Sequence, residues 1–390
     1  MRVTALATHG PLAAAVRAAL TARGWDPERS RFAAAGLNQL ALLLEDIDES
    51  VREALVRWAA RAGIDVLTGE GWALVAGVAS RLAVLARPDR APPELHPIVP
   101  DLAQWFASYA DPPRRWAIRG GEIPLDEPVL VGILNVTPDS FSDGGRFDRI
   151  DAALTQAEKL KADGCRLLDV GGESTRPGAA PVTIEEEIAR VVPAIEALKA
   201  RGLGPVSVDT RKSRVARAAL DAGAAVVNDV SGLSFDAELG ATVAAAGAGL
   251  ILMHMRGTPD TMDSLACYDH VAVDVARELR EAATRAQDAG VAAERIVLDP
   301  GFGFAKNPAQ NFRLLDELAT ITALGLPVLV GPSRKRFLGA ATGGAVEDRD
   351  RATAVACALA WERGARLFRV HDAGLAREAL AVVRALEADP

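Results

Sequence analysis

The chain has 390 residues, 49% of them hydrophobic and 25% charged, which is enough for a large core and too long for one ordinary domain. Its net charge of −8 argues against a nucleic-acid-binding protein, although local Arg and Lys clusters could still bind a small anion. No apolar segment reaches the roughly 18 residues of a membrane helix, and no apolar segment follows Met1 as in a signal peptide. The three cysteines are far apart in the sequence. We therefore expect a cytoplasmic protein whose cysteines stay reduced.

Residues 1–87 predict a small α/β domain. We expect strands at 2–7 and 64–67, and helices at 11–23, 49–61 and 72–85. Asp48 or the residue after it would cap the second helix, and Gly63 would end it. Trp58 and Trp72 are expected in the core of the domain. No catalytic combination of residues is recognisable here, so the sequence does not indicate what this domain does.

A proline-rich segment, residues 88–121, follows this domain. Five prolines occur between positions 88 and 100. Because proline lacks a backbone N–H and fixes φ, we interpret this segment as a connector. The stretch 101–128 leads into the next domain and is expected to include a β-hairpin with its turn at 119–122.

From residue 122 to residue 390 the chain alternates between short apolar runs and stretches with helical spacing. The apolar runs, which predict strands, lie at 129–134, 166–170, 205–208, 225–227, 249–253, 295–298, 327–330 and 366–370. The helical stretches lie at 151–163, 184–201, 213–222, 236–247, 270–289, 309–324, 349–363 and 374–387. This alternation predicts a parallel sheet, and eight such units predict a closed (β/α)8 TIM barrel. A doubly wound open sheet is the alternative, but it would need a GxGxxG segment after its first strand, which the sequence lacks.

Polar residues follow all eight predicted strands. In a (β/α)8 barrel these positions surround one rim, where the active sites of such barrels lie. They include Asn135, Glu173, Asp209, Asn228, His254, Asp299, Ser333 and His371. One such residue is commonly a helix cap, but eight around one rim predict a polar ligand pocket, because buried polar groups without partners are costly. For His254, a core position and a functional position are equally open.

The most specific stretch is the segment from Asn135 to Gly145, which reads NVTPDSFSDGG after a buried strand. It resembles the first signature of the dihydropteroate synthases, a family of the folate pathway. Further segments resemble signatures of that family in the same order, at 171–178, 209–210, 228–229, 299–304, 333–335 and 369–371. Each segment alone is a weak indication, but the ordered set is specific. The resemblance covers residues 122–390.

The resemblance implies a transferase that joins 4-aminobenzoate to (7,8-dihydropterin-6-yl)methyl diphosphate and releases diphosphate. It also implies a homodimer and a target of sulfonamides. A pterin edge carries ring N–H, amino and carbonyl groups, which carboxylates and amides bind by paired hydrogen bonds. By resemblance, the catalytic residues at this edge are Asp209, Asn228, Asp299 and Lys335, and Met253 and Phe304 pack beside the ring.

The departing diphosphate requires cations and hydrogen-bond donors aimed at its charge. By resemblance, Asn135 is a ligand of Mg²⁺, an ion that prefers oxygen ligands and substrate phosphates. The sequence has no His/Cys cluster of the kind that would favour zinc. The resemblance assigns the diphosphate itself to Thr175, Arg176, Arg369 and His371.

The arylamine requires an apolar slot and a partner for its carboxylate. By resemblance, Phe141 and Pro177 form the slot and Ser333 meets the carboxylate. One residue departs from the family pattern, because many bacterial relatives carry Ser where this chain has Arg336. Its guanidinium could pair with the carboxylate or point to solvent, which leaves the contacts to aminobenzoate and sulfonamides open.

Two other functions are weighed against this one. A pterin-binding methyltransferase of the methyltetrahydrofolate type would share the barrel and the pterin carboxylates, but it would not need the residues assigned to diphosphate. A non-catalytic pterin-binding paralogue would be favoured by the loss of key polar residues. The residues most informative here are all present, namely Asn135, Asp209, Lys335 and His371.

Overall fold

A computed structural model describes residues 2–7, 39–110, 112–137, 146–174, 182–258 and 260–387. The chain forms two compact units. The first comprises Met1–Pro112 together with Ala319–Gly325, and the second comprises Pro113–Leu318 with Leu326–Pro390. In the part of the chain that the structure describes, no helix has the length and apolar character needed to cross a membrane.

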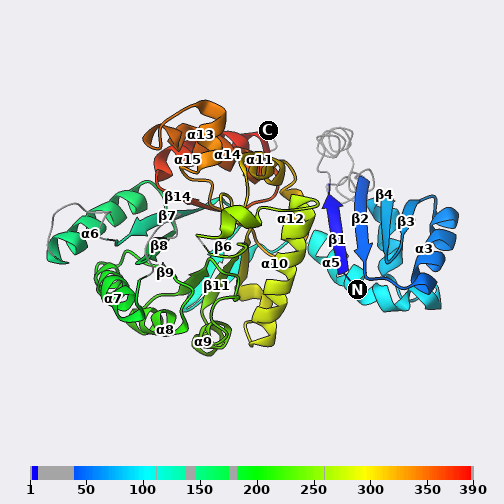
Figure 1. Cartoon of the computed structure of the whole chain (residues 1–390), viewed down its shortest axis with the longest axis horizontal. Coiled ribbons are helices and arrows are strands. Elements are labelled where there is room, and N and C mark those ends of the chain that lie inside the picture. Colours follow the sequence, from blue (N-terminus) through cyan, green and yellow to red (C-terminus); the bar gives the residue numbers. More distant parts are fainter. Residues whose placement is uncertain are drawn as a thin grey trace, which may run out of the picture. The chain divides into compact units, whose positions relative to one another are not determined.

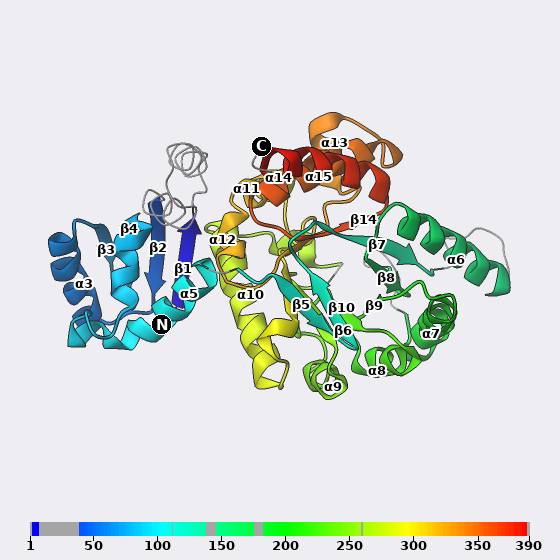
Figure 2. The ribbon, with the colours of Figure 1, turned by 180° about the vertical axis from the view of Figure 1, so that it is seen from behind.

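The second unit is built on eight parallel strands in the order β12-β11-β10-β9-β8-β7-β14-β13. Figures 1 and 2 show β14, β7, β8 and β9 following one another in this sheet. A parallel bridge between Leu298 and Val328 joins the two ends of this sheet, so that it closes into a barrel. The predicted (β/α)8 barrel is therefore confirmed. The strands are β7 (Val129–Asn135), β8 (Leu167–Gly171), β9 (Val206–Asp209), β10 (Val226–Asp229), β11 (Gly249–Met253), β12 (Ile296–Asp299), β13 (Leu329–Val330) and β14 (Leu367–Val370).

A helix follows each strand of the barrel, and Figure 2 shows these helices outside the strands. They are α6 (Arg146–Ala162), α7 (Ile184–Ala200), α8 (Ser213–Ala222), α9 (Leu239–Ala246), α10 (Val271–Asp288), α11 (Pro308–Asp316), α14 (Asp350–Glu362) and α15 (Ala373–Glu387). Side chains cap the first turns of two of these helices. Thr183 accepts a hydrogen bond from Glu186 N, and Asn307 forms a reciprocal capping box with Gln310.

The structure corrects two of the predicted barrel elements. The helix expected at 309–324 ends at Asp316, and α12 (Ala319–Thr322) belongs to the first unit. A short helix that was not predicted, α13 (Arg336–Thr342), lies between β13 and α14. Only 7 residues long, it is too short to show a full helical repeat in the sequence.

An apolar plug fills the N-terminal end of the barrel. The predicted hairpin is present as β5 (Arg115–Ile118) and β6 (Gly121–Pro124). Its Trp116 is fully buried, and the indole Nε1 donates a hydrogen bond to the Arg295 carbonyl at 2.9 Å. The surrounding cluster takes residues from the starts of the strands, including Val129 and Leu367. This end is closed by apolar packing, so only the C-terminal end of the barrel is left for a polar site.

The first unit contains an antiparallel sheet in the order β1-β2-β4-β3. Its strands are β1 (Arg2–Ala7), β2 (Gln39–Glu45), β3 (Asp65–Gly69) and β4 (Trp72–Val78). The expected helix is present as α3 (Glu49–Ala62), capped by Asp48 and ended by Gly63 at φ 64°. The helix predicted at 11–23 lies outside the described residues.

The helix predicted at 72–85 is wrong. Its first half is β4, which pairs with both β2 and β3, and α4 (Ala79–Leu82) and the 3-10 helix η1 (Ala83–Ala86) follow. Pairing on two sides outweighs a local helical pattern. Trp72, expected in the core, is 39% exposed, whereas Trp58 packs against the core as expected.

The segment predicted as a connector, 88–121, is largely part of the first unit. It forms a 3-10 helix η2 (Pro93–Ile98) and α5 (Val99–Ala110), and Leu95, Leu102 and Trp105 join the buried cluster of that unit. Pro93 and Pro100 lie in the first turns of η2 and α5, where a backbone N–H has no helical partner, whereas Pro97 lies inside η2. The unit boundary therefore lies near Pro112 rather than at residue 87.

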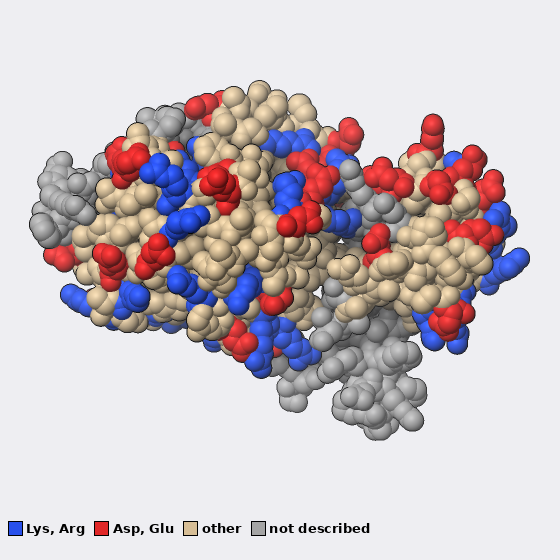
Figure 3. Space-filling model, turned by 90° about the horizontal axis from the view of Figure 1, so that it is seen from below, with Lys and Arg blue, Asp and Glu red and all other residues tan. Residues whose placement is uncertain are grey.

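Charged side chains of both signs are mixed on one face of the molecule. On the face shown in Figure 3, blue and red side chains alternate, and the described residues there form no broad region of one sign.

Replacing Trp116 by Ala should destabilise the second unit strongly. The buried indole would leave a cavity in the plug, and such Trp-to-Ala changes cost about 3–5 kcal/mol. Urea unfolding of the two proteins measures the difference. Trp72→Ala is the matched control, because that indole is 39% exposed and should cost far less. Equal losses for the two variants would contradict the assignment of Trp116 to the barrel core.

Candidate active site

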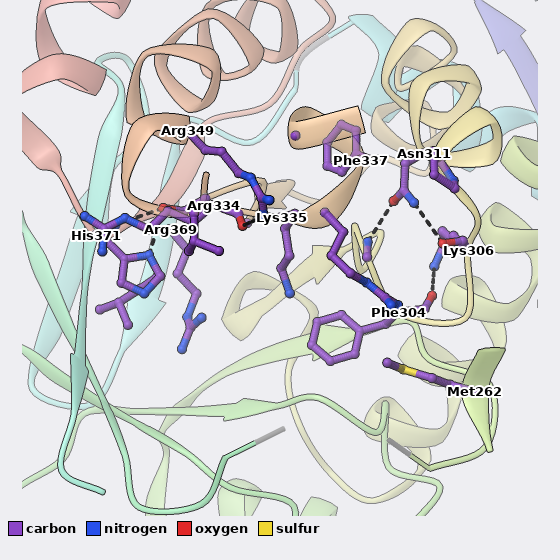
Figure 4. Close-up of a pocket in the computed structure, with 18 of the residues that line it drawn as sticks. Met262, Phe304, Lys306, Asn311, Arg334, Lys335, Phe337, Arg349, Arg369 and His371 are labelled. Carbon is purple, nitrogen blue, oxygen red and sulfur yellow. Dashed lines mark hydrogen bonds between the residues drawn. The ribbon is translucent and has the colours of Figure 1, made fainter. Parts of the chain in front are cut away.

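A cavity of about 1210 Å³ opens at the C-terminal ends of the barrel strands. Figure 4 shows Arg369, Lys335 and Phe304 pointing into it. The predicted site residues that line it are Asn135, Asp209, Phe304, Ser333, Lys335, Arg369 and His371. Three others, Asn228, Met253 and Asp299, are buried and do not line it. The remaining four, Phe141, Thr175, Arg176 and Pro177, lie outside the described residues, so their assignments stay predictions.

The register of the strands aligns several of these side chains. Asn135 pairs with Gly171, Gly171 with Asp209, and Asp209 with Asn228 on the next strand. Gly171 lies between two polar side chains in this row. A Cβ added there would lie 3.3 Å from Asn135 Oδ1 and 3.7 Å from Asp209 Cβ. The glycine therefore leaves space between Asn135 and Asp209, at the predicted meeting point of diphosphate and pterin.

Arg369 connects two carboxylates at the base of the cavity. Its Nε donates to Asp169 Oδ2 at 2.6 Å and its Nη2 donates to Asp209 Oδ2 at 2.9 Å. Burial raises the pKa of Asp209 to about 7, while Arg369 opposes this shift and the nearby carboxylates of Asp169, Glu187 and Asp229 add to it. Burial and the neighbouring carboxylates thus favour the uncharged form of Asp209, and Arg369 favours the charged form.

Asp169 is a site residue that the sequence reasoning did not select. It is completely buried and accepts hydrogen bonds from Ser207 Oγ, Asn228 Nδ2 and Arg369 Nε. The signal that could have found it is a carboxylate inside the apolar run 167–170. A charge in a buried strand requires partners, and here they come from three other strands.

The loop after β12 is shaped around Asp299. The Asp299 carboxylate accepts a 2.7 Å hydrogen bond from Gly301 N, and burial raises its pKa to about 6. Gly301 has φ +68°, and a Cβ there would lie 2.0 Å from the His254 carbonyl oxygen, so only glycine fits. At Gly303, φ +79°, a Cβ would touch the Lys335 side chain at 2.9 Å. Lys335 passes over this glycine and places Nζ 4.0 Å from the centre of the Phe304 ring.

The loop after β13 is fixed by Arg334, which adopts the left-handed conformation at φ +56°. Its guanidinium donates two hydrogen bonds to Asp350, at 2.8 and 2.7 Å. Arg334 is thereby held against α14, and its neighbours on either side, Ser333 and Lys335, line the cavity. A bidentate ion pair of this kind is both strong and directional.

Ser333 and His371 form a connected pair. Ser333 Oγ accepts a hydrogen bond from His371 N at 3.1 Å and lies 2.9 Å from His371 Nδ1. Burial and the nearby Arg334 and Arg369 lower the pKa of His371 to about 3, so the ring is neutral near pH 7. When the Ser333 hydroxyl donates to Nδ1, the proton of the neutral ring is on Nε2. His371 therefore offers a neutral N–H donor rather than a cation.

His254, left open by the sequence, is a satisfied core residue. It is 4% exposed, and its two ring nitrogens lie 2.9 Å from Glu278 Oε2 and 2.9 Å from Lys306 Nζ. Burial lowers the pKa of His254 to about 4. Lys306 was not selected from the sequence. Its Nζ also donates to the carbonyls of Gly301 and Phe304, so it holds the loop after β12 from within.

The position that departs from the family pattern, Arg336, lies at the mouth of the cavity. Its Nη2 is 3.3 Å from Asp263 Oδ1, and both side chains are well exposed, at 69% and 64%. The guanidinium is thus largely exposed to solvent and contacts a carboxylate of the protein, and its pairing with the aminobenzoate carboxylate stays a prediction. An exposed pair of this kind is weak, so a ligand carboxylate could compete for Arg336.

The described residues contain no group of three His, Cys, Asp or Glu side chains that could hold a metal ion. Asn135 contributes one amide oxygen to the cavity wall, beside Asp209. A wall with so few protein ligands fits an ion that takes most of its ligands from substrate phosphate and water, as Mg²⁺ does. Such a wall does not fit a structural zinc site.

The raised pKa of Asp209 predicts how stability depends on pH. Because the folded pKa of about 7 exceeds the ordinary 3.8, the stability linked to this proton is present below pH 3.8 and is lost as the pH rises to about 7. Relative to Asp209→Asn, the wild-type protein should lose a few kcal/mol over this window, since one pKa unit corresponds to about 1.4 kcal/mol. Urea unfolding from pH 4 to 8 measures it, with Asp126→Asn as a surface control. Parallel curves for wild type and Asp209→Asn would contradict the shift.

Known proteins resemble this chain throughout the barrel. The model of the pterin-binding enzyme family matches residues 131–371. The dihydropteroate synthase of Escherichia coli (strain K12) is 44% identical over 269 residues, 68% of this chain and 94% of that protein. The structure of Xanthomonas albilineans dihydropteroate synthase with 4-aminobenzoic acid is 45% identical, has a TM-score of 0.67, and covers 71% of this chain and 99% of its own. The same enzyme in complex with 7,8-dihydropteroate is 42% identical, with a TM-score of 0.65, and covers 71% of this chain and 100% of its own. The chain therefore belongs to the pterin-binding enzyme family and, within it, to the dihydropteroate synthases.

Proposed function

We propose that the protein joins (7,8-dihydropterin-6-yl)methyl diphosphate to 4-aminobenzoate, giving 7,8-dihydropteroate and diphosphate. The observation that supports this proposal is that one cavity combines a region of hydrogen-bond acceptors with a region of hydrogen-bond donors. An acceptor-rich base around Asp209 adjoins donors from Arg369 and His371. The ligands of the two Xanthomonas structures, 4-aminobenzoic acid and 7,8-dihydropteroate, are the second substrate and the product of this reaction.

The base of the cavity suits the pterin. Asp209 lines it, and Asn228 and Asp299 lie buried at the ends of β10 and β12. Acceptors of this kind bind the ring N–H and amino groups of a pterin edge, and a buried acceptor left unpaired strongly disfavours ligands without those donors. Lys335, held over Phe304, would donate to the pterin carbonyl or ring nitrogen, with Met253 packed below Phe304.

The part of the cavity lined by His371 and Arg369 suits the diphosphate. His371 would donate from Nε2 and Arg369 would supply charge, together with Thr175 and Arg176. Mg²⁺, when bound through Asn135, would neutralise part of the charge on the departing diphosphate. In the reaction the bond between the methylene carbon and the diphosphate oxygen breaks, the amine nitrogen bonds to that carbon, and the amine loses one proton. The Asp209 carboxylate would stabilise positive charge that develops on the pterin.

The arylamine would enter over the mouth of the cavity. Phe141 and Pro177 remain the predicted walls of its slot. Ser333 Oγ accepts from His371 N and lies 2.9 Å from His371 Nδ1, so its single hydroxyl proton can be donated to a ligand carboxylate only when it is not donated to Nδ1. Arg336 is a nearby cation whose ion pair with Asp263 is exposed and therefore weak. We propose that Arg336 binds the carboxylate of 4-aminobenzoate.

The product assay tests this function. Protein incubated with the pterin diphosphate, 4-aminobenzoate and Mg²⁺ should release diphosphate and form 7,8-dihydropteroate, both measurable by chromatography. Asp299→Ala should remain folded and lose at least about tenfold in pterin affinity by calorimetry, because it removes a buried acceptor. Asp316→Ala is the control, since that side chain is 65% exposed on the outer surface. A folded wild-type protein that forms no product would contradict the proposal.

The proposed assembly is a homodimer through α14 and α15. These helices pack side by side, and each exposes apolar side chains four residues apart, which share one helix face. On α14 they are Val355 and Leu359, and on α15 they are Val382, 66% exposed, and Leu386, 76% exposed. Exposed apolar surface of this kind is typical of an interface between subunits.

Charges placed on this face should separate the subunits. The double variant Val382→Glu with Leu386→Glu should sediment as a monomer in analytical ultracentrifugation, while the wild-type protein sediments as a dimer, because association would bury the new carboxylates. Val56→Glu is the control, an exposed apolar residue of the first unit. A double variant that remains dimeric would show that the interface lies elsewhere.

A further inference from the structure

We propose that Asp169 is a positioning residue that fixes which atoms Asn228 and Arg369 present to the substrate, and thereby selects ligand edges rich in hydrogen-bond donors. The proposal rests on the proposed function, because it concerns the pterin part of the same site. Asp169 does not line the cavity and is completely buried on β8. Asp169 has no exposed surface, whereas Asn228 is 3% exposed and Arg369 lines the cavity, so Asp169 acts through these neighbours rather than on the substrate.

All three hydrogen-bond donors to Asp169 come from other strands of the barrel. Ser207 Oγ, directly opposite on β9, donates to Oδ1 at 2.6 Å. Asn228 Nδ2 and Arg369 Nε both donate to Oδ2, at 2.9 and 2.6 Å. These partners lie 59 and 200 residues away in the chain, so the closed barrel is what assembles them. Charge-assisted hydrogen bonds of this length are the strong ones.

The contact to Asn228 decides the orientation of its amide. An ionised carboxylate can only accept hydrogen bonds, so the NH2 group of Asn228 must face Asp169. The amide oxygen then points the other way, and among the described residues no hydrogen bond to Asn228 Oδ1 is formed. Asn228 is therefore presented as an acceptor. Without Asp169 the amide could rotate by half a turn and present its donors instead.

The contact to Arg369 directs a charge. Asp169 holds Nε while Asp209 holds Nη2, so the guanidinium plane is defined by two carboxylates. Within the described part of the chain, Nη1 makes no hydrogen bond, and Arg369 lines the cavity. Asp169 thus fixes both the acceptor oxygen that Asn228 presents and the direction in which the positive charge of Arg369 points.

Together these contacts define the ligand edge that the site accepts. Asp209, Asn228 and Asp299 offer acceptors, so the matching edge must supply donors, as the amino group and ring N–H of a pterin do. A pteridine with oxygen in place of that amino group would face Asn228 Oδ1 with an acceptor, and both would stay unpaired in a buried site. A site built for a donor rejects such an analogue strongly.

Calorimetry with two ligands tests the proposal. Pterin and lumazine, its analogue with a carbonyl in place of the amino group, should differ by at least about tenfold in affinity for the wild-type protein. Asp169→Ala frees the amide of Asn228, so the ratio of the two affinities should fall toward one. Asp169→Ser, whose hydroxyl is too short to reach Asn228, should behave in the same way and serves if the Ala variant does not fold.

Two matched variants separate positioning from a general structural role. Asp169→Asn keeps an oxygen for Asn228 and Arg369 and can turn its NH2 toward Ser207, so it should retain the pterin preference. Ser207→Ala removes a different hydrogen bond from the same carboxylate and should also retain it. If the folded Ala or Ser variant binds both ligands more weakly but in the wild-type ratio, Asp169 does not set the selectivity. A wild-type protein that binds neither ligand would instead contradict the proposed function.

Discussion

The pairing of Arg369 with Asp169 and Asp209 is the interaction on which the rest of the site depends. It places one guanidinium between two carboxylates inside a closed barrel, where an unpaired charge of either sign would be costly. The pairing holds β14 to β8 and β9 and sets the charge at the base of the cavity. Removing any one of the three groups would leave a buried charge on the others. The fold therefore holds the acceptors that would bind the pterin in position before a ligand binds.

The barrel keeps this polar base isolated by dividing its interior into two ends. The hairpin with Trp116 closes the N-terminal end with apolar side chains, and the polar layer that starts at Asp169 lies above it. At the other end, Gly171 leaves room between Asn135 and Asp209, Gly301 leaves room for the His254 carbonyl, and Gly303 leaves room for the Lys335 side chain. Rigid strands position the acceptors, while the loops after β12 and β13 add Lys335 and Phe304 through fixed turns.

Local patterns in the sequence predicted most of the barrel, because each strand is a short apolar run whose ends are marked by polar residues. They failed where distant pairing decides the outcome. The segment 72–78 is a strand because two neighbouring strands pair with it, and prolines at 93 and 97 sit inside helical turns rather than a connector. Motifs led to Asn135, Asp209 and Lys335, which line the cavity, but they did not lead to Asp169 and Lys306. Their partners, Arg369 and His254, are distant in the chain and meet them only in the closed barrel.

The division of the chain into units has a consequence for its synthesis. The core of the first unit, formed by side chains such as Leu42 and Trp105, also includes Ala319, with Ala323 packed against it. A ribosome delivers the first 112 residues early, but these two alanines only after six of the eight barrel strands. The N-terminal unit therefore cannot complete its packing as an independent domain during translation. Its final consolidation must wait for the polypeptide that folds as the barrel, so the maturation of the two units is interleaved.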